Sequence, residues 1–197
     1  PLRNTLKIQN PLGEDTSVMR TTALPSMLEI LARNYAFHNK DVQLYELAKI
    51  YLPRDDSPLA NEPKVFVFGA YGPHTTFYSL KGQVEALLRQ LNIRPAEYTA
   101  QRENPSYHPG RCAALTIDGK PYGVLGQIHP HVAGNYGVDA ELYAAELRFD
   151  ALYESKGSQP LYQPLPKFPA VTRDIAVVCD AAVTVGELED AIRKGAK

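Results

Sequence analysis

The densest group of metal-ligating side chains lies in the stretch HPGRCAALTIDGKPYGVLGQIHPH, residues 108–131. It contains His108, Cys112, His129 and His131. A structural zinc site takes four nitrogen or sulfur ligands, commonly as closely spaced pairs. A hairpin would bring the two ends of this stretch together, so a zinc site across them is one hypothesis. The alternative, which the spacing favours, is that Cys112 is a small buried hydrophobic residue and that the histidines mark turns.

Other chemical motifs are weaker still. The sequence has no Gly-x-Ser-x-Gly motif and no pattern typical of a cysteine protease around either cysteine. Gly123 and Gly126 lie inside a strand pattern, where they cannot present a loop of amides to a phosphate. We expect these two glycines to admit a neighbouring backbone instead. The residues alone therefore predict no catalytic residue, no cofactor-binding residue and no metal site.

The stretch itself predicts a β-hairpin. Residues 111–117 and 121–128 are two short strand patterns, and Asp118-Gly119 between them accepts the positive φ angles of a tight turn. Pro130 suits the first turn of a short helix that ends near Gly137. Further strands are expected at 42–52, 64–72, 96–102 and 142–149 because these segments are rich in β-branched and aromatic residues or alternate in polarity.

Two longer helices are expected, at 21–38 and 77–91. In the first helix Leu24, Leu28 and Leu31 belong to one apolar stripe at three- and four-residue spacing, and Thr21 or Thr22 can cap its start. The stripe either faces the core or contacts another subunit. Short connections and hairpins favour an antiparallel sheet flanked by helices, which is an α+β fold.

The last part of the chain differs in composition. The prolines in 154–170 resist both helix and sheet, so a linker is expected there. Beyond it, residues 173–179 read as a strand, and Thr184 with Glu187 forms a capping box ahead of a helix. One strand and one helix cannot enclose a core. Both ends of the sequence suggest an excised piece of a longer protein.

Composition excludes several classes of protein. The formal net charge is -1, so no basic excess supports autonomous binding of DNA or RNA. No apolar run is long enough to predict a membrane span. Two cysteines do not make a disulfide framework, and a reducing cytoplasmic location is expected.

Three segments carry a resemblance to a known family. They are NPLGEDTSVMRTTALPSMLEILARN, HPGRCAALTIDGKPYGVLGQIHPHVAGNYG and FPAVTRDIAVVCD, and they occur in this order over nearly the whole chain. Together they resemble the C-terminal part of the beta subunit of bacterial phenylalanyl-tRNA synthetase. The resemblance implies a class II synthetase catalytic-like domain at 1–153, a proline-rich linker at 154–167, and the beginning of a ferredoxin-like anticodon-binding domain at 168–197.

The resemblance also implies a role. In that family the alpha subunit attaches phenylalanine to its tRNA with ATP and magnesium, within an α2β2 complex. The catalytic-like beta domain is non-catalytic, so we transfer no catalytic or metal residue to this chain. Partners would be the alpha subunit and tRNA, without a membrane or DNA.

Candidate contact residues follow from the resemblance. They are Arg173 for tRNA, His108 and Arg111 at the mouth of the hairpin for a partner, and Leu24, Leu28 and Leu31 for the alpha subunit. The alternative function is a vestigial class II pocket for an amino acid or nucleotide, lined by Tyr98, Arg102 and Arg148.

Overall fold

A computed structural model describes residues 4–155, 157, 162, 164–165 and 167–195. The chain divides into two compact units, residues 1–160 and 161–197, and each is described by itself. In the described part of the chain, no helix is long and apolar enough to cross a membrane.

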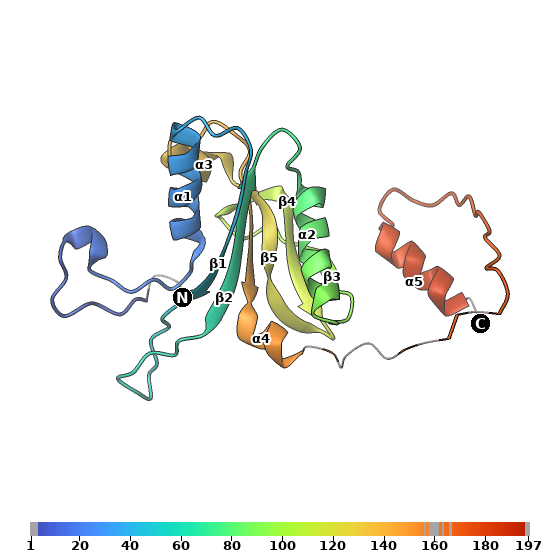
Figure 1. Ribbon diagram of the computed structural model, residues 1–197, viewed down its shortest axis with the longest axis horizontal. Helices are drawn as coiled ribbons and strands as arrows, with labels where there is room; N and C mark the ends of the chain where they lie inside the picture. Colours follow the sequence, from blue (N-terminus) through green and yellow to red (C-terminus); the bar gives the residue numbers. More distant parts are fainter. Residues whose placement is uncertain (1–3, 156, 158–161, 163, 166, 196–197) are drawn as a thin grey trace. The chain divides into compact units, whose positions relative to one another are not determined.

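The first unit is built on one antiparallel sheet (Figure 1). In spatial order the strands that the structure describes are β1 (Val42–Lys49), β2 (Lys64–Tyr71), β6 (Tyr143–Arg148), β5 (Lys120–Ile128), β4 (Tyr107–Ile117) and β3 (Glu97–Ala100). Every neighbouring pair runs antiparallel. This arrangement confirms the predicted α+β fold with an antiparallel sheet.

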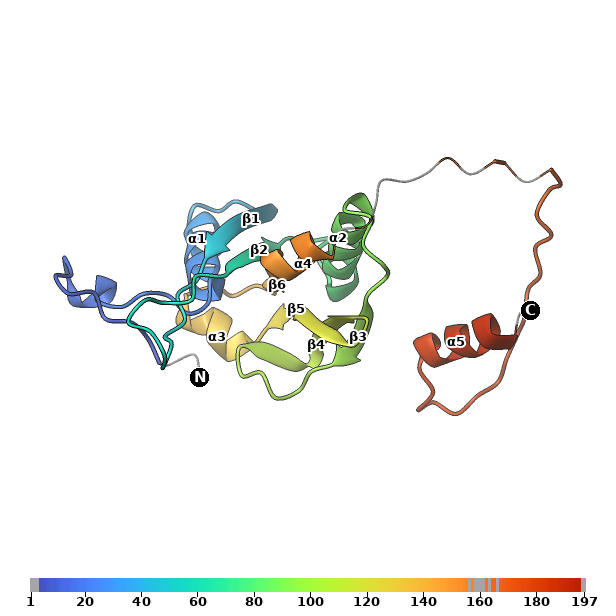
Figure 2. The same cartoon turned by 90° about the horizontal axis from the view of Figure 1, so that it is seen from below.

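Helices cover both faces of this sheet. Figure 2 shows α1 (Leu24–Ala36) and the short α3 (Pro130–Asn135) on one side and α2 (Phe77–Gln90) on the other. Successive residues of a strand point to opposite faces. In β6, Ala144 therefore packs in the core beneath α1, whereas Ala145 and Leu147 pack in the core beneath α2. The unit has one apolar core on each side of the sheet.

The predicted hairpin between β4 and β5 is confirmed. Ile117 pairs with Lys120, so the turn has two residues. Asp118 and Gly119 have φ angles of 50° and 74°, as a type I′ turn requires.

The apolar stripe of α1 faces the chain's own core. Leu24, Leu28 and Leu31 are all buried, and Leu31 has no exposed surface. They pack with residues of β1 and β2. The expectation that these side chains contact the alpha subunit needs correction, because burial leaves them no surface for a partner.

Helix α4 (Phe149–Glu154) was not expected. The strand before it ends at Arg148, although the apolar alternation continues to Phe149. The main-chain N–H of Lys64 donates to Asp150 Oδ2 at 2.8 Å, and Leu152 is buried in the α2-side core. These two contacts favour a helical turn over a longer strand.

The second unit contains α5 (Val185–Gly195), and its predicted capping box is confirmed. The main-chain N–H of Thr184 donates to Glu187 Oε2 at 2.7 Å, and the Glu187 N–H donates back to Thr184 Oγ1 at 3.4 Å. The strand expected at 173–179 is wrong, because those residues form no ladder. Ile175 is 69% exposed, since no described strand of this unit pairs with it.

Gly126 shows why the sheet needs glycine inside a strand. A Cβ on Gly126 would lie 2.5 Å from the Arg111 carbonyl oxygen and 2.8 Å from Cys112 Cα, closer than real Cβ atoms approach. The predicted role of this glycine, to admit a neighbouring backbone, is confirmed.

We expect Gly126→Ala to lower the free energy of unfolding by about 1–3 kcal/mol, because the methyl group overlaps fixed backbone atoms. Gly134→Ala is the matched control. Gly134 lies in helix α3, where alanine is favourable, and a Cβ there would meet no atom within 4 Å. Urea denaturation measures both. Equal stability of the two variants would contradict the close approach.

Candidate functional site: a carboxylate cavity beneath helix α1

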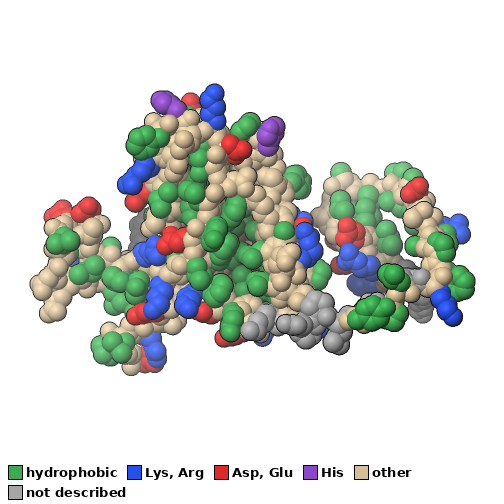
Figure 3. Space-filling view, viewed as in Figure 1, with side chains coloured by type: hydrophobic (Ala, Val, Ile, Leu, Met, Phe, Trp, Pro, Cys, Tyr) green, Lys and Arg blue, Asp and Glu red, His purple; other side chains and the backbone are tan. Residues whose placement is uncertain are grey.

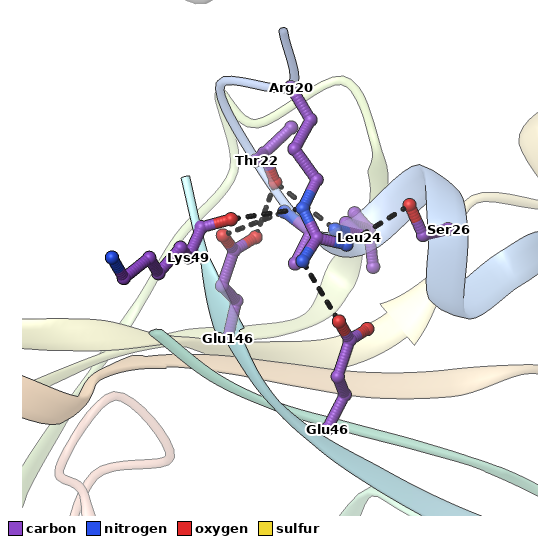
Figure 4. Close-up of polar contacts among 8 residues, drawn as sticks. Arg20, Thr22, Leu24, Ser26, Glu46, Lys49 and Glu146 are labelled. Atoms are coloured by element: carbon purple, nitrogen blue, oxygen red, sulfur yellow. Dashed lines mark hydrogen bonds and ion pairs between the residues drawn. The ribbon is translucent and has the colours of Figure 1, made fainter. Parts of the chain in front are cut away.

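Arg20 connects the segment before α1 to strand β1 (Figure 4). Its Nε donates to the Lys49 carbonyl oxygen at 2.9 Å, and its Nη2 lies 2.9 Å from Glu46 Oε1. Nη1 reaches Ser26 Oγ at 3.5 Å. All three nitrogens of the guanidinium group therefore contact the chain's own acceptors.

Glu146 holds the start of α1 from the central strand β6 (Figure 4). The Thr22 hydroxyl donates to Glu146 Oε2 at 2.5 Å, and the Ala23 N–H donates to Oε1 at 3.3 Å. The Leu24 N–H in turn donates to Thr22 Oγ1 at 3.2 Å. A carboxylate is favourable here, because the first N–H groups of a helix carry partial positive charge. Thr22 thus accepts a hydrogen bond at the start of α1, close to its predicted capping position. Its hydrogen bond to Glu146 was not predicted.

Beside this cluster lies a cavity of about 380 Å³ between α1, α3 and the sheet. Most of its lining is apolar, from side chains such as Leu28, Val124 and Val132. Glu146 and Arg148 also line it, and they share one face of β6 because they are two residues apart. Glu146 is half-buried and Arg148 is exposed.

Tyr107 lines the same cavity, and its ring is almost completely buried. Its hydroxyl has no hydrogen-bond partner among the described residues. Burial, and secondarily the nearby Glu146 carboxylate, raises the pKa of Tyr107 far above its ordinary value. The phenol therefore stays neutral.

A second polar cluster lies at the mouth of the hairpin. Arg111 Nη1 donates to Gln127 Oε1 and lies equally close, 2.8 Å, to Glu141 Oε1. The Tyr143 hydroxyl donates to Glu141 Oε2 at 2.7 Å. These hydrogen bonds, Tyr143 first and then Arg111, lower the pKa of Glu141. Arg111, Glu141 and Tyr143 border a separate open cleft of about 700 Å³.

His108, His129 and His131 stack on one another, and Cys112 is not part of this stack. Ring centroids of His108 and His129 are 6.5 Å apart, and those of His129 and His131 are 5.2 Å apart. Nδ1 of His108 accepts from the Gly110 N–H, and Nδ1 of His129 accepts from the His131 N–H. Cys112 points into the core beneath α1. Within the described ranges, no group of three or more His, Cys, Asp or Glu side chains is placed to hold a metal ion, so the zinc hypothesis is wrong.

Comparison with known proteins identifies the lineage. Residues 1–149 match the family described as "Phenylalanyl tRNA synthetase beta chain CLM domain". The chain belongs to this family.

Similar curated proteins are beta subunits of phenylalanine–tRNA ligase. That of Clostridium tetani is 46% identical over 100% of this chain and 25% of its own length. That of Clostridium acetobutylicum is 44% identical over 98% of this chain and 24% of its own length. The chain therefore spans about a quarter of the length of these relatives.

Solved structures support the fold. A pyrrolysyl-tRNA synthetase of Desulfitobacterium hafniense superposes with a TM-score of 0.61 at 11% identity. The match covers 77% of this chain and 53% of that chain. At this identity the likeness concerns the fold alone.

The three residues expected to line one vestigial pocket do not meet in the structure. Tyr98 packs on the α2 side, with the Lys81 ammonium 4.6 Å above its ring. Arg148 lines the cavity on the α1 side, and Arg102 lies in an exposed loop after β3. The sheet separates Tyr98 from Arg148, so that pocket prediction is wrong.

The other predicted contacts have different outcomes. His108 and Arg111 lie near one another at the hairpin mouth, where Arg111 already pairs with Glu141. Arg173 lies in the second unit, exposed and outside regular structure. Sequence reasoning missed Glu146 and Arg20. For Glu146 a signal was present, because it lies between Ala145 and Leu147 in a central strand, where side chains are usually apolar.

We expect Tyr107→Phe to raise the free energy of unfolding by about 1 kcal/mol, because it removes a buried hydroxyl that has no partner among the described residues. The matched variant is Tyr71→Phe, whose hydroxyl donates to the Asn39 carbonyl oxygen at 2.9 Å. This second change should lower stability by about 1 kcal/mol. Urea denaturation of both variants measures whether the two changes in the free energy of unfolding have opposite signs. A loss of stability in Tyr107→Phe would contradict this prediction.

The two cysteines should differ in reactivity. Burial raises the pKa of Cys112 to about 11, so it remains a thiol near neutral pH, whereas Cys179 is exposed. Ellman's reagent at about pH 8 should titrate one thiol in the folded chain and both after unfolding. The Cys179→Ser variant should show no rapid reaction. Two rapidly reacting thiols in the folded chain would refute this placement of Cys112.

Proposed function

We propose that this chain is a non-catalytic assembly part of a phenylalanyl-tRNA synthetase beta subunit. In the complete α2β2 complex the alpha subunit attaches phenylalanine to tRNA with ATP and magnesium, and this chain supports that complex. Family membership and the class II type of fold support the assignment. The proposed domains are 1–153, catalytic-like; 154–167, linker; and 168–197, the beginning of a ferredoxin-like anticodon-binding domain.

The observation that carries the non-catalytic role is the occupation of the sheet face beneath α1. Leu24, Leu28 and Leu31 fill it with apolar atoms. Activating an amino acid with ATP needs free cationic groups around the phosphates. Beside this face, the Arg20 guanidinium already contacts Glu46 and the Lys49 carbonyl, and Glu146 places a negative charge in the cavity.

An assembly surface is available on the other side of the sheet. Tyr45 and Leu47 of the edge strand β1 are 73% and 50% exposed, and the Tyr45 ring stacks on Phe66 at 5.7 Å. We name Tyr45, Leu47 and Phe66 the β1–β2 patch. Figure 3 shows apolar side chains at the surface of the sheet unit. Since exposed apolar clusters mark interaction sites, we assign the β1–β2 patch, in place of the α1 stripe, to the alpha subunit.

The remaining assignments rest on the family. Arg173 is proposed to lie near tRNA in the intact subunit, and His108 and Arg111 are proposed to contact a partner at the hairpin mouth. The proposed location is the cytoplasm, where aminoacylation takes place. This chain needs no cofactor of its own in this role.

Catalysis is tested by phenylalanine-dependent exchange between ATP and pyrophosphate. The chain alone should show no exchange above buffer, because apolar side chains of α1 cover this face of the sheet and Glu146 places a negative charge where a triphosphate would lie. The homologous alpha subunit together with its intact beta subunit is the positive control. Measurable exchange by the chain alone would overturn the non-catalytic assignment.

Assembly is tested by combining Tyr45→Glu with Leu47→Glu in the intact beta subunit. Burying two new charges at an apolar interface is unfavourable, so affinity for the alpha subunit should fall at least about tenfold, which is about 1.4 kcal/mol. Tyr78→Glu is the control, because Tyr78 is equally exposed but lies on α2. Analytical ultracentrifugation gives the affinities. Unchanged assembly of the double variant would exclude the β1–β2 patch as the alpha contact.

A further inference from the structure

The Glu146 carboxylate is the unusual feature of the cavity beneath α1. Its two bonded donors, the Thr22 hydroxyl and the Ala23 N–H, are both neutral. Among the described residues, no cationic side chain forms a salt bridge with it. A carboxylate has about four acceptor positions, so two remain for another donor.

Most of the cavity lining around this carboxylate is apolar. The cavity of about 380 Å³ lies among Leu28, Val124, Val132 and Tyr136. A charge that is partly removed from water is costly unless a counter-charge pairs with it. Small-molecule sites combine such an apolar lining with a few polar groups that orient the ligand. The cavity thus combines a carboxylate that has no salt bridge among the described residues with room for an apolar body.

We propose that this cavity binds a small primary amine with a compact apolar or aromatic body, whose ammonium group donates to Glu146. The body lies against the apolar lining between α1 and α3. The ammonium takes the acceptor positions that Thr22 and Ala23 leave open. This binding site goes beyond the assembly role and does not depend on it, since it uses the α1 side of the sheet and the β1–β2 patch lies on the α2 side.

Other ligand classes fit less well. A phosphate or nucleotide would bring negative charge against Glu146, and Arg20 has its guanidinium nitrogens on the chain's own acceptors. A neutral apolar molecule would leave the carboxylate without a counter-charge. Arg148, exposed at the cavity, adds a positive charge that opposes an amine. A variant without the Arg148 charge should therefore bind an amine as tightly as the unchanged chain, or more tightly.

Titration of the full chain with phenethylamine, followed by calorimetry and by amide chemical shifts, tests the proposal. Phenethyl alcohol is the neutral probe of nearly the same size. We expect saturable binding of the amine, at least about tenfold tighter than that of the alcohol, because an ion pair in an apolar site is strong. Shifted amides should belong to Thr22, Ala23 and the residues around Val124. Absence of amine binding, or equal affinity for the alcohol, would overturn the proposal.

Three variants locate the site. Glu146→Gln should lose at least about tenfold in affinity for phenethylamine, whereas Arg148→Gln should retain or improve it. Val124→Phe keeps the carboxylate but fills the cavity, so it should also lose binding, and it provides a separate test if Glu146→Gln fails to fold. Binding that survives Val124→Phe, or that is lost in Arg148→Gln, would place the amine elsewhere. Assembly with the alpha subunit should be unchanged in Val124→Phe, which separates this result from the assembly role.

Discussion

The structure of the first unit depends on the contact between Glu146 and the start of helix α1. The carboxylate comes from β6, which lies between β2 and β5 in the sheet, and it accepts hydrogen bonds from Thr22 and Ala23. This contact joins residues more than a hundred positions apart in the chain and places the first turn of α1 over the sheet. Arg20 adds a second connection to β1. With its start held in this way, α1 can bury Leu24, Leu28 and Leu31, and this face of the sheet becomes an apolar core.

Local sequence signals predicted much of this fold. The Asp118-Gly119 turn, the helices at α1 and α2 and the glycine at 126 each depend on neighbours in sequence or on backbone freedom. Predictions failed where a distant partner decides the outcome. Residues 173–179 have a strand pattern, but no strand that the structure describes pairs with them. Helix α4 forms because Asp150 and Leu152 make contacts within the sheet unit.

The site was harder to predict than the fold. The side chains of the histidines and Cys112 can bind metal, yet Cys112 lies in the core beneath α1 and the histidines stack on one another. Glu146 lies in a strand and Arg20 in the segment before α1. Their contacts form only when the fold brings strands β6 and β1 to the start of α1. The apolar stripe of α1 could have faced a core or a partner, and periodicity alone does not distinguish these outcomes.

The Thr22–Glu146 hydrogen bond holds the start of α1 against the sheet. A double-mutant cycle with Thr22→Val and Glu146→Leu, each of which removes one partner of the hydrogen bond, tests it most directly by urea denaturation. Because hydrogen bonds to charged groups contribute about 1.5–3 kcal/mol, we predict a coupling free energy within that range. Strictly additive effects of the two substitutions would contradict this account of how α1 covers the sheet.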